Sequence, residues 1–176
     1  MHEKRSASTP DSVFVTERLV VRRWRDTDLD SLLRIYGDDE AMRWVGDGVA
    51  ITREQCLEWF EVTRRNYLDR GYGMFALELR GESDVIGFAG IVHPGGQAEA
   101  EVKYALARAH WGRGLATEVV IGLLSYGHRT HRLERIIATV APENAASCRV
   151  LEKAGMRRIG LRGEGGEASL LFESAA

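Results

Sequence analysis

Two glycines and an alanine occupy alternate positions in the stretch AHWGRGLATE, residues 109–118, where a strand-like run gives way to a helical pattern. A helix that begins directly after such a turn offers free main-chain N–H groups, and the positive end of its dipole, to an anion. Because Gly112, Gly114 and Ala116 have little or no side chain, a ligand can approach this main chain closely. The pattern predicts a phosphate site, and a tight turn packed by small residues is the alternative.

Two well-known phosphate loops can be compared with this stretch directly. A P-loop needs Gly-Lys-Ser/Thr after its first glycine, and these residues do not follow here. The dinucleotide fingerprint GxGxxG fits Gly112 and Gly114, but Thr117 stands where the third glycine belongs. Glu134 has the spacing of a ribose-binding acid, but it precedes a strand-like run instead of ending one. Neither loop accounts for the stretch.

The composition predicts one compact domain in a reducing compartment. The chain has 176 residues, of which 44% are hydrophobic and 28% charged. Its 24 basic and 26 acidic residues give a net charge of −2, which predicts no general attraction to nucleic acid or to a membrane surface. Cys56 and Cys148 form no CxxC pair and suit the cytosol, so we expect a cytoplasmic protein. The five histidines lack metal-binding spacing, and no metal is predicted.

The elements that must position the glycine loop begin near residue 13. Residues 1–12 are expected to be a disordered lead-in, and residues 13–176 a single domain, since no linker or repeat interrupts them. A β-branched run over residues 14–23 predicts the first strand. The apolar spacing after it predicts a helix with Asp26 or Thr27 as its N-cap.

The rest of the chain predicts a mixed sheet covered by helices. Thr52 and Gln55 form a capping-box pattern that opens a second helix, which ends near residue 69. Further strands are predicted over residues 75–79, 85–91, 101–106, 135–140, 156–161 and 168–172, and further helices over residues 116–127 and 144–155. This order of strands and helices is typical of an α/β protein with helices packed on its sheet.

Three blocks of the sequence resemble the GNAT N-acetyltransferases, and within them the branch of the ribosomal-protein N-terminal acetyltransferases. VTERLVVRRWRDTDLDSLL resembles the opening strand and helix of that branch; EVKYALARAHWGRGLATE resembles strand 4, the pyrophosphate loop and the next helix; and TVAPENAASCRVLEKAGM resembles strand 5 and the Asn-x-x-Ser helix. With the predicted hairpin between them, the match runs in one order over roughly residues 14–160. The family's loop pattern begins with Arg or Gln, where this chain has Trp111, and Gly114 and Ala116 match its later positions.

The resemblance implies an α/β (α+β) fold with a mixed, mostly antiparallel central sheet. About seven strands would be flanked by about four helices, and strand 4 (residues 101–106) and strand 5 (residues 135–140) would splay apart. It implies acetyl-CoA as co-substrate, with the pantetheine arm in that gap and the pyrophosphate on the glycine loop. The implied function is transfer of an acetyl group to a primary amine, either a protein N-terminus or a small-molecule amine, directly within a ternary complex.

The resemblance also implies site residues. Those expected at the cofactor are Tyr104, Ala105, Leu106, Trp111, Gly112, Arg113, Gly114, Leu115, Ala116, Thr117, Asn144 and Arg149. Arg108 is a further candidate for the phosphates, and solvated surface arginine is the alternative for it, as for Arg113 and Arg149. Asn144 can serve as helix N-cap, as pantetheine contact, or as both.

Acetyl transfer needs a neutral amine and a stabilised leaving thiolate. The resemblance makes Glu101 the candidate base or water relay, with Glu99 in reserve, and Ser147 the hydrogen-bond donor to the sulfur. Lys103 replaces the glycine common at its position, and a cation would favour the charged form of Glu101 if the two side chains meet. Cys148 as an acyl-accepting nucleophile is the covalent alternative, and a buried cysteine the plainer one.

The acceptor is expected between residues 38–50 and the connection that precedes the last strand. Four acidic residues there could attract an amine, or be solvated loop residues: Asp38, Asp39, Glu40 and Asp47. Trp44 could be a pocket wall or a core anchor. The tail is shorter than the family usually shows, so the pocket is either open or completed by a second subunit in a homodimer. A catalytically silent acyl-CoA-binding or regulatory module of the same fold is the alternative function.

Overall fold

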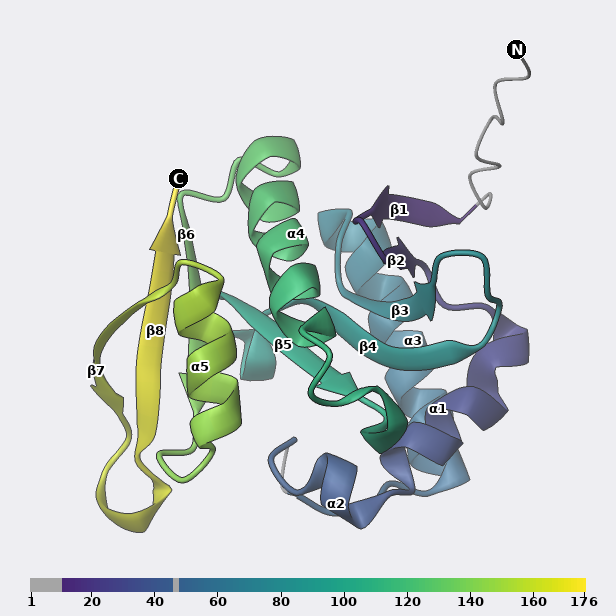
Figure 1. Cartoon of the computed structure of the whole chain (residues 1–176), viewed down its shortest axis with the longest axis horizontal. Coiled ribbons are helices and arrows are strands. Elements are labelled where there is room, and N and C mark those ends of the chain that lie inside the picture. The colour runs from purple at the N-terminus through teal and green to yellow at the C-terminus, as the bar shows by residue number, and fades with distance from the viewer. Residues whose placement is uncertain (1–10, 46–47) are drawn as a thin grey trace.

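A single mixed sheet runs through the computed structural model, which describes residues 11–45 and 48–176 (Figure 1). Within these residues the sheet has eight strands in the order β1-β2-β3-β4-β5-β6-β8-β7. They are β1 (Ser12–Val15), β2 (Leu19–Arg22), β3 (Met74–Leu79), β4 (Val85–Val92), β5 (Ala100–Leu106), β6 (Arg135–Val140), β7 (Arg157–Arg162) and β8 (Ser169–Ala175). Among the described strands, only β5 and β6 pair in parallel, so the predicted mixed, mostly antiparallel sheet is confirmed.

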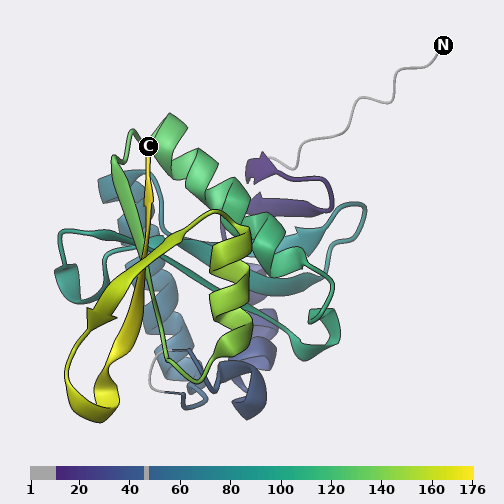
Figure 2. The same cartoon turned by 60° about the vertical axis from the view of Figure 1, so that its left-hand side comes forward.

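Helices cover both faces of the sheet (Figures 1 and 2). They are α1 (Leu29–Tyr36), α2 (Asp39–Met42), α3 (Arg53–Arg70), α4 (Leu115–Thr130) and α5 (Ala145–Lys153). On one face, Leu123 of α4 and Leu151 of α5 belong to the same buried cluster as Val102 of β5. On the other face, Ile35 of α1 and Phe60 of α3 pack in a second cluster. The sheet therefore separates two apolar cores, and β5 contributes side chains to both of them.

The opening of the domain differs from the prediction. Residues 14–23 do not form one strand, because a turn after Val15 reverses the chain and β2 pairs back onto β1. Thr16 closes the turn: its N–H donates to Leu19 O (2.9 Å), and its hydroxyl accepts from Leu19 N (3.1 Å). The first α-helix begins later than predicted, after a 3-10 turn at residues 26–28, with Asp28 at its N-cap position. The sheet thus gains an eighth strand.

The start of α3 confirms the capping box. The Thr52 hydroxyl accepts from Gln55 N (3.2 Å), and the Gln55 side chain accepts from Thr52 N (2.8 Å). Gly71 ends the helix with φ at +80°, a conformation that favours glycine. The short α2 was not predicted; the Asp38 carboxylate caps it by accepting from Glu40 N and Ala41 N.

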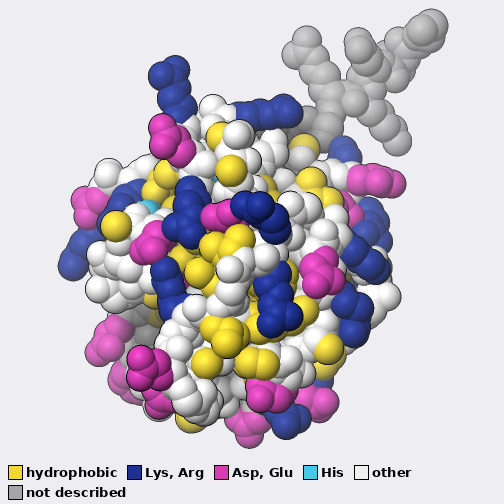
Figure 3. All heavy atoms as spheres, turned by 90° about the vertical axis from the view of Figure 1, so that its left-hand side faces the viewer, with side chains coloured by type: hydrophobic (Ala, Val, Ile, Leu, Met, Phe, Trp, Pro, Cys, Tyr) yellow, Lys and Arg dark blue, Asp and Glu magenta, His cyan; other side chains and the backbone are white. Residues whose placement is uncertain are grey.

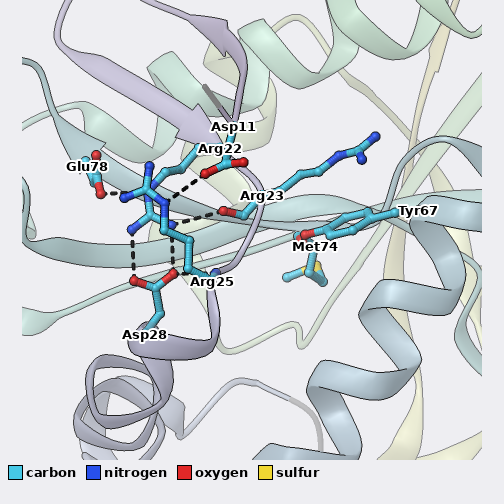
Figure 4. Close-up of polar contacts among 8 residues, drawn as sticks. All are labelled: Asp11, Arg22, Arg23, Arg25, Asp28, Tyr67, Met74 and Glu78. Carbon is cyan, nitrogen blue, oxygen red and sulfur yellow. Dashed lines mark hydrogen bonds and ion pairs between the residues drawn. The ribbon is translucent and has the colours of Figure 1, made fainter. Parts of the chain in front are cut away.

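A buried ion cluster fixes β2 against α1 and β3 (Figure 4). The guanidinium of Arg22, which is 1% exposed, binds Asp28 through two nitrogens at 2.7 and 3.0 Å. Its Nε donates to Glu78 Oε1 (2.6 Å). Asp28 also accepts from Arg25 N (2.7 Å), so its carboxylate binds both the buried Arg22 guanidinium and the main chain of the 3-10 turn. This is why Asp28 makes no side-chain cap to its own helix.

The two ends of the sheet are edge strands. Residues 1–10, most of the predicted lead-in, lie outside the described residues, while Ser12 already belongs to β1. At the other edge, β7 exposes Ile159 (40%) and Leu161 (61%). Figure 3 shows the face formed by this end of the molecule, where hydrophobic side chains are bordered by Lys and Arg. The sheet is open at β7, and β8 separates that strand from β6.

Candidate active site

The loop before α4 leaves a row of main-chain donors free. Gly112 and Gly114 have φ angles of +70° and +75°, in the left-handed region that favours glycine. The first backbone hydrogen bond of α4 runs from Glu118 N to Gly114 O (3.1 Å). Within the described part of the chain, no hydrogen bond reaches the N–H groups of residues 112–117. A Cβ atom built on Gly112 would meet nothing within 4 Å, so an anion can reach these donors.

Arg18 and Glu118 hold this loop against the β1–β2 turn. Arg18 donates from its guanidinium to Arg113 O (2.7 Å) and to Glu118 Oε2 (2.7 Å). The Thr16 hydroxyl and the Arg18 N–H donate to the other oxygen of Glu118. Burial alone would raise the pKa of Glu118, but the hydrogen bonds from Thr16 and Arg18 outweigh it and lower the pKa. No motif in the sequence pointed to this pair, because its partners are about 100 residues apart.

A gap opens between β5 and β6. The two strands pair at only two positions, Ala100 with Ile136 and Glu101 with Ile137, and then diverge (Figure 1). β6 instead pairs along its whole length with β8 on its other side. The predicted splay of strands 4 and 5 is confirmed.

The edge of β5 that faces the gap carries main-chain groups without a neighbouring strand. Ala107 N donates to Ile86 O of β4 (2.8 Å). In an antiparallel pair of strands, every second residue forms such hydrogen bonds with the same neighbour, so Ala105, opposite Phe88, also bonds to β4. Ala105 therefore directs its main chain to β4, whereas Tyr104 and Leu106 direct theirs to the gap. The geometry favours these two, rather than Ala105, as main-chain partners of an extended ligand.

Trp111 closes the far end of this edge. Its indole nitrogen donates to Leu106 O (2.8 Å), which leaves the Leu106 N–H for a ligand. At the start of α4, Leu115 is buried, and Ala116 and Thr117 are half-buried. Of the loop residues predicted at the cofactor, residues 111–114 are exposed and Leu115 is buried in the apolar core.

Ser147 and Tyr104 meet across the gap. The Tyr104 hydroxyl lies 2.6 Å from the Ser147 hydroxyl, and burial raises the pKa of Tyr104 to about 12. Asn144 caps α5 by accepting from Ser147 N (3.1 Å), which confirms its capping role. Two residues predicted for different tasks, one on β5 and one on α5, therefore form a single hydroxyl pair.

Glu101 is buried and fully engaged. It is 2% exposed, its Oε1 binds Lys103 Nζ (2.6 Å) and the Thr139 hydroxyl, and its Oε2 accepts from Gln97 Nε2 (3.1 Å). The side chains of Lys103 and Glu101, whose contact the sequence left open, therefore meet. Any amine that is to use this carboxylate must replace one of these donors.

The two catalytic candidates lie on opposite faces of the sheet. Successive side chains along a strand point to opposite faces of the sheet. Tyr104 packs against the apolar core that contains α4 and α5, whereas Ala105 packs in the core that contains α1 and α3. Glu101 and Lys103 share the face of Ala105. The gap is thus flanked by hydroxyls on the α5 side and by an ion pair on the α3 side.

Glu99, the reserve base, is also paired. Arg162 of β7 donates to Glu99 Oε1 (2.7 Å). The main-chain N–H of Glu99 itself, followed by the Arg162 guanidinium, lowers the pKa of this carboxyl. A carboxylate held in its charged form is a weaker base, so the structure gives no advantage to Glu99 over Glu101.

The predicted phosphate arginines separate into two groups. Arg108 binds Asp38 Oδ2 (2.6 Å) and Glu40 Oε2 (2.9 Å), which ties the residues after β5 to α2. Its guanidinium is therefore paired with acidic residues at α2, which favours a structural role over phosphate binding. Arg113 is exposed and contacts His110 Nδ1 (3.1 Å), and Arg149 is exposed on α5, so both can turn toward a ligand.

Two of the four acidic residues expected to attract an acceptor are paired within the chain, and Asp39 is the first residue of α2. Asp38 and Glu40 bind Arg108, and the Arg108 hydrogen bond is the main cause that lowers the pKa of Asp38. Asp47 lies outside the described residues. Trp44 is 43% exposed with Arg43 over its ring (5.1 Å), so it is not a core anchor.

Cys148 is half-buried on α5, and burial raises the pKa of its thiol. A protonated thiol is a weak nucleophile, so the covalent alternative loses support. Across residues 11–45 and 48–176, no cluster of three or more His, Cys, Asp and Glu forms a metal-binding group, and no helix is long and apolar enough to cross a membrane.

Known proteins are similar to this chain in sequence and in fold. The family model described as Acetyltransferase (GNAT) domain matches residues 18–157. The chain is 30% identical over 151 residues to the uncharacterized N-acetyltransferase YoaA of Bacillus subtilis, which is 85% of either protein. The fold is similar to an acetyltransferase from Agrobacterium tumefaciens (TM-score 0.80, 24% identity, 93% and 94% of the two chains). It is also similar to RimL, a ribosomal L7/L12 alpha-N-protein acetyltransferase in complex with coenzyme A (TM-score 0.77, 15% identity, 93% and 97%).

The family model covers most of the chain, and its matched region contains the glycine loop, the splay and the Asn-x-x-Ser helix. The sequence blocks that suggested the resemblance are the same segments that build the site. This chain belongs to the GNAT family of acetyltransferases.

Proposed function

We propose that the chain transfers the acetyl group of acetyl-CoA to a primary amine, either a protein N-terminus or a small-molecule amine, directly within a ternary complex. The observation that carries this proposal is the continuity of the open β5 edge with the free donors of residues 112–117. An extended chain of amides can add to an open strand edge, and a helix N-terminus with free N–H groups suits a pyrophosphate. Acetyl-CoA has both parts in this order.

At the phosphate end, the N–H groups of residues 112–117 are the proposed donors. Each charge-assisted hydrogen bond of this kind contributes about 1.5–3 kcal/mol. Arg113 and Arg149 are exposed next to the loop and on α5, and they would add charge from the solvent side. The Arg18–Glu118 pair contributes by holding the loop in its binding conformation before the ligand arrives.

At the sulfur end, Ser147 is the proposed donor to the developing thiolate. Tyr104 stays protonated because its pKa is about 12, so its hydroxyl can donate to Ser147 while Ser147 donates onward. A thiol with a pKa of about 8.5 needs only this hydrogen bond to leave, without full proton transfer from the serine. Asn144 fixes Ser147 from the other side through the helix cap.

At the acceptor end, Glu101 is the proposed base or water relay. The acceptor amine would approach from the α3 side and take the place of the Lys103 ammonium at Oε1. Thr139 and Gln97 would keep the carboxylate in position during the exchange. The Lys103 side chain is 41% exposed, so it has room to swing away.

The alternative, a catalytically silent acyl-CoA-binding or regulatory module, is favoured by one observation. Lys103 occupies the carboxylate that an acceptor needs, and a permanently occupied base would bind acetyl-CoA without turnover. The two functions therefore differ in whether Lys103 can be displaced.

Thiol release across a panel of amines separates them. The panel contains peptides with free N-termini, polyamines, aminoglycosides and small amine metabolites, each with acetyl-CoA and the purified chain. The proposed function predicts CoA release above the amine-free rate with at least one class. Tight acetyl-CoA binding with no release for any acceptor would support the silent module.

A homodimer and a cytoplasmic location remain proposals. The connection between β7 and β8 spans only residues 163–168, so a second subunit is one way to complete the acceptor pocket. Sedimentation at several concentrations, with and without CoA, tests this. A monomer at every concentration would leave the pocket open on that side.

A further inference from the structure

Lys103 reaches across the gap in which the acetyl group is proposed to lie. Its Nζ is 2.6 Å from Glu101 Oε1 on its own strand and 3.3 Å from the Thr139 hydroxyl on β6. The side chain is 41% exposed, although its carboxylate partner is buried. An amine held on the candidate base, at the edge of the gap, is in the position that the acceptor amine must take.

We propose that Lys103 is itself an acetylation site, modified within the chain by the bound acetyl-CoA. This inference rests on the proposed function, because it uses the same thioester and the same base. The main chain of Tyr104, the next residue, faces the gap, so a ligand paired with it passes beside the Lys103 side chain. Proximity of this kind converts a slow bimolecular reaction into a unimolecular one.

The chemistry balances with groups that are already in contact. The Lys103 ammonium gives one proton to Glu101, and the neutral nitrogen attacks the thioester carbonyl carbon. An N–C bond forms and the C–S bond breaks, so the electron pair leaves with sulfur. The second proton of the nitrogen passes to the thiolate, with Ser147 and Tyr104 beside it, and Glu101 releases its proton to solvent. The products are N-acetyl-lysine, CoA thiol and one proton.

The sequence offers an internal control, because the chain has only three lysines. Lys153 is exposed in the last turn of α5, and Lys4 lies outside the described residues. Peptide mass spectrometry after incubation with acetyl-CoA and no acceptor compares all three. Lys103 should gain an acetyl group at least about tenfold faster than Lys153.

Two further features mark an intramolecular reaction. The rate constant at Lys103 should saturate with acetyl-CoA and stay unchanged when the protein is diluted. Gly114→Glu, which blocks the phosphate loop, should reduce Lys103 modification to the Lys153 rate, and Glu101→Gln should reduce it about tenfold or more. Modification of Lys103 at the Lys153 rate in the unaltered protein would overturn the proposal.

A footprint that needs no acetyl transfer tests the placement alone. An amine-reactive succinimidyl ester is applied with and without free CoA, and the labelling of Lys103 and Lys153 is compared. CoA should protect Lys103 severalfold and leave Lys153 unchanged. Equal labelling of Lys103 in both samples would show that the thiol end lies elsewhere, which also overturns the proposal.

These outcomes distinguish the inference from the function on which it rests. If external amines are acetylated and Lys103 is not, the inference fails and the proposed function stands. If acetyl-CoA does not bind, the proposed function fails first.

Discussion

The Tyr104 hydroxyl lies 2.6 Å from the Ser147 hydroxyl, so a strand residue and a helix residue form one polar pair across the gap between β5 and β6. This pair places two protonated hydroxyls on the α5 side, opposite the Glu101–Lys103 ion pair on the α3 side. The site is therefore asymmetric, with donors for a leaving thiolate on one face and a carboxylate for an amine on the other.

Removal of either hydroxyl should slow transfer without loosening the cofactor. Ser147→Ala and Tyr104→Phe should each lower kcat/KM about tenfold to a hundredfold, because each interrupts the same donor chain. The double variant should lose little more than either single variant. Steady-state kinetics and acetyl-CoA titration check this, and additive losses would mean that the two hydroxyls act separately.

The pH profile should contain no step from Tyr104. With a pKa of about 12, the phenol is protonated throughout the working range, and its hydrogen bond does not change there. The rate should therefore be flat between about pH 9 and 10 once the acceptor is neutral. A loss of activity in that interval that disappears in Tyr104→Phe would contradict this assignment.

Glu101→Gln should lower kcat/KM by about a hundredfold or more near neutral pH, and the loss should shrink as the pH rises and free amine becomes abundant. Glu99→Gln is the matched control, since Glu99 is paired to Arg162 at the edge of the site. Full activity of Glu101→Gln from about pH 6 to 9 would move the base elsewhere.

Lys103→Ala should raise kcat/KM for external amines severalfold, because it leaves Oε1 of Glu101 free for the acceptor. Lys103→Arg keeps a cation at the carboxylate and should not show this gain. A fall of activity in Lys103→Ala with normal acetyl-CoA binding would mean that the ammonium assists transfer.

The Arg18–Glu118 pair should make the free energy of unfolding depend on pH in the acidic range. A carboxylate whose pKa is lowered by folding stabilises the protein above its unfolded value of about 4.5, and this contribution is lost as the pH falls through the folded pKa. Glu118→Gln should unfold more easily at pH 7, by about 1–2 kcal/mol, and the difference from the unaltered protein should shrink progressively as the pH falls below the unfolded pKa and through the lower folded pKa of Glu118. Urea unfolding measures both values. Glu152→Gln, on the exposed surface of α5, is the control.

The buried Arg22 cluster should dominate the stability of the first half of the sheet. Arg22→Met leaves the buried carboxylates of Asp28 and Glu78 without their cation and should cost about 3–5 kcal/mol. Arg25→Met breaks an exposed pair with Asp11 and should cost less than about 1 kcal/mol. Equal losses in thermal or urea unfolding would contradict the assigned difference in burial.

The sequence correctly predicted those elements whose ends are set by residues close together in the chain. The capping box at Thr52 and the glycines of the loop are read within four residues, and both formed as predicted. The turn after Val15 was missed, because Thr16 closes it within a β-branched run that reads as continuous strand. The start of α1 was misplaced because Asp28 serves Arg22 rather than its own helix.

Side-chain pairings between distant segments could not be read from the sequence. Arg108 has the sequence position of a phosphate ligand, but it forms ion pairs with the carboxylates of Asp38 and Glu40, about 70 residues earlier in the chain. The Arg18–Glu118 pair shows the same limit. Lys103 beside Glu101 was accessible to prediction because residues two apart on a strand share a face.

The central claim is that the glycine loop and the open β5 edge bind acetyl-CoA, and calorimetric titration of acetyl-CoA tests it most directly. The comparison is between the unaltered chain, Gly114→Ala and Gly114→Glu. Both substitutions strain a residue with φ at +75°, but only the second adds a charge and a long side chain beside the loop. We predict clear binding to the unaltered chain, a modest loss of about 1 kcal/mol for Gly114→Ala, and a much larger loss for Gly114→Glu. No binding to the unaltered chain at about 1 mM acetyl-CoA, or equal affinity in a folded Gly114→Glu variant, would contradict the account.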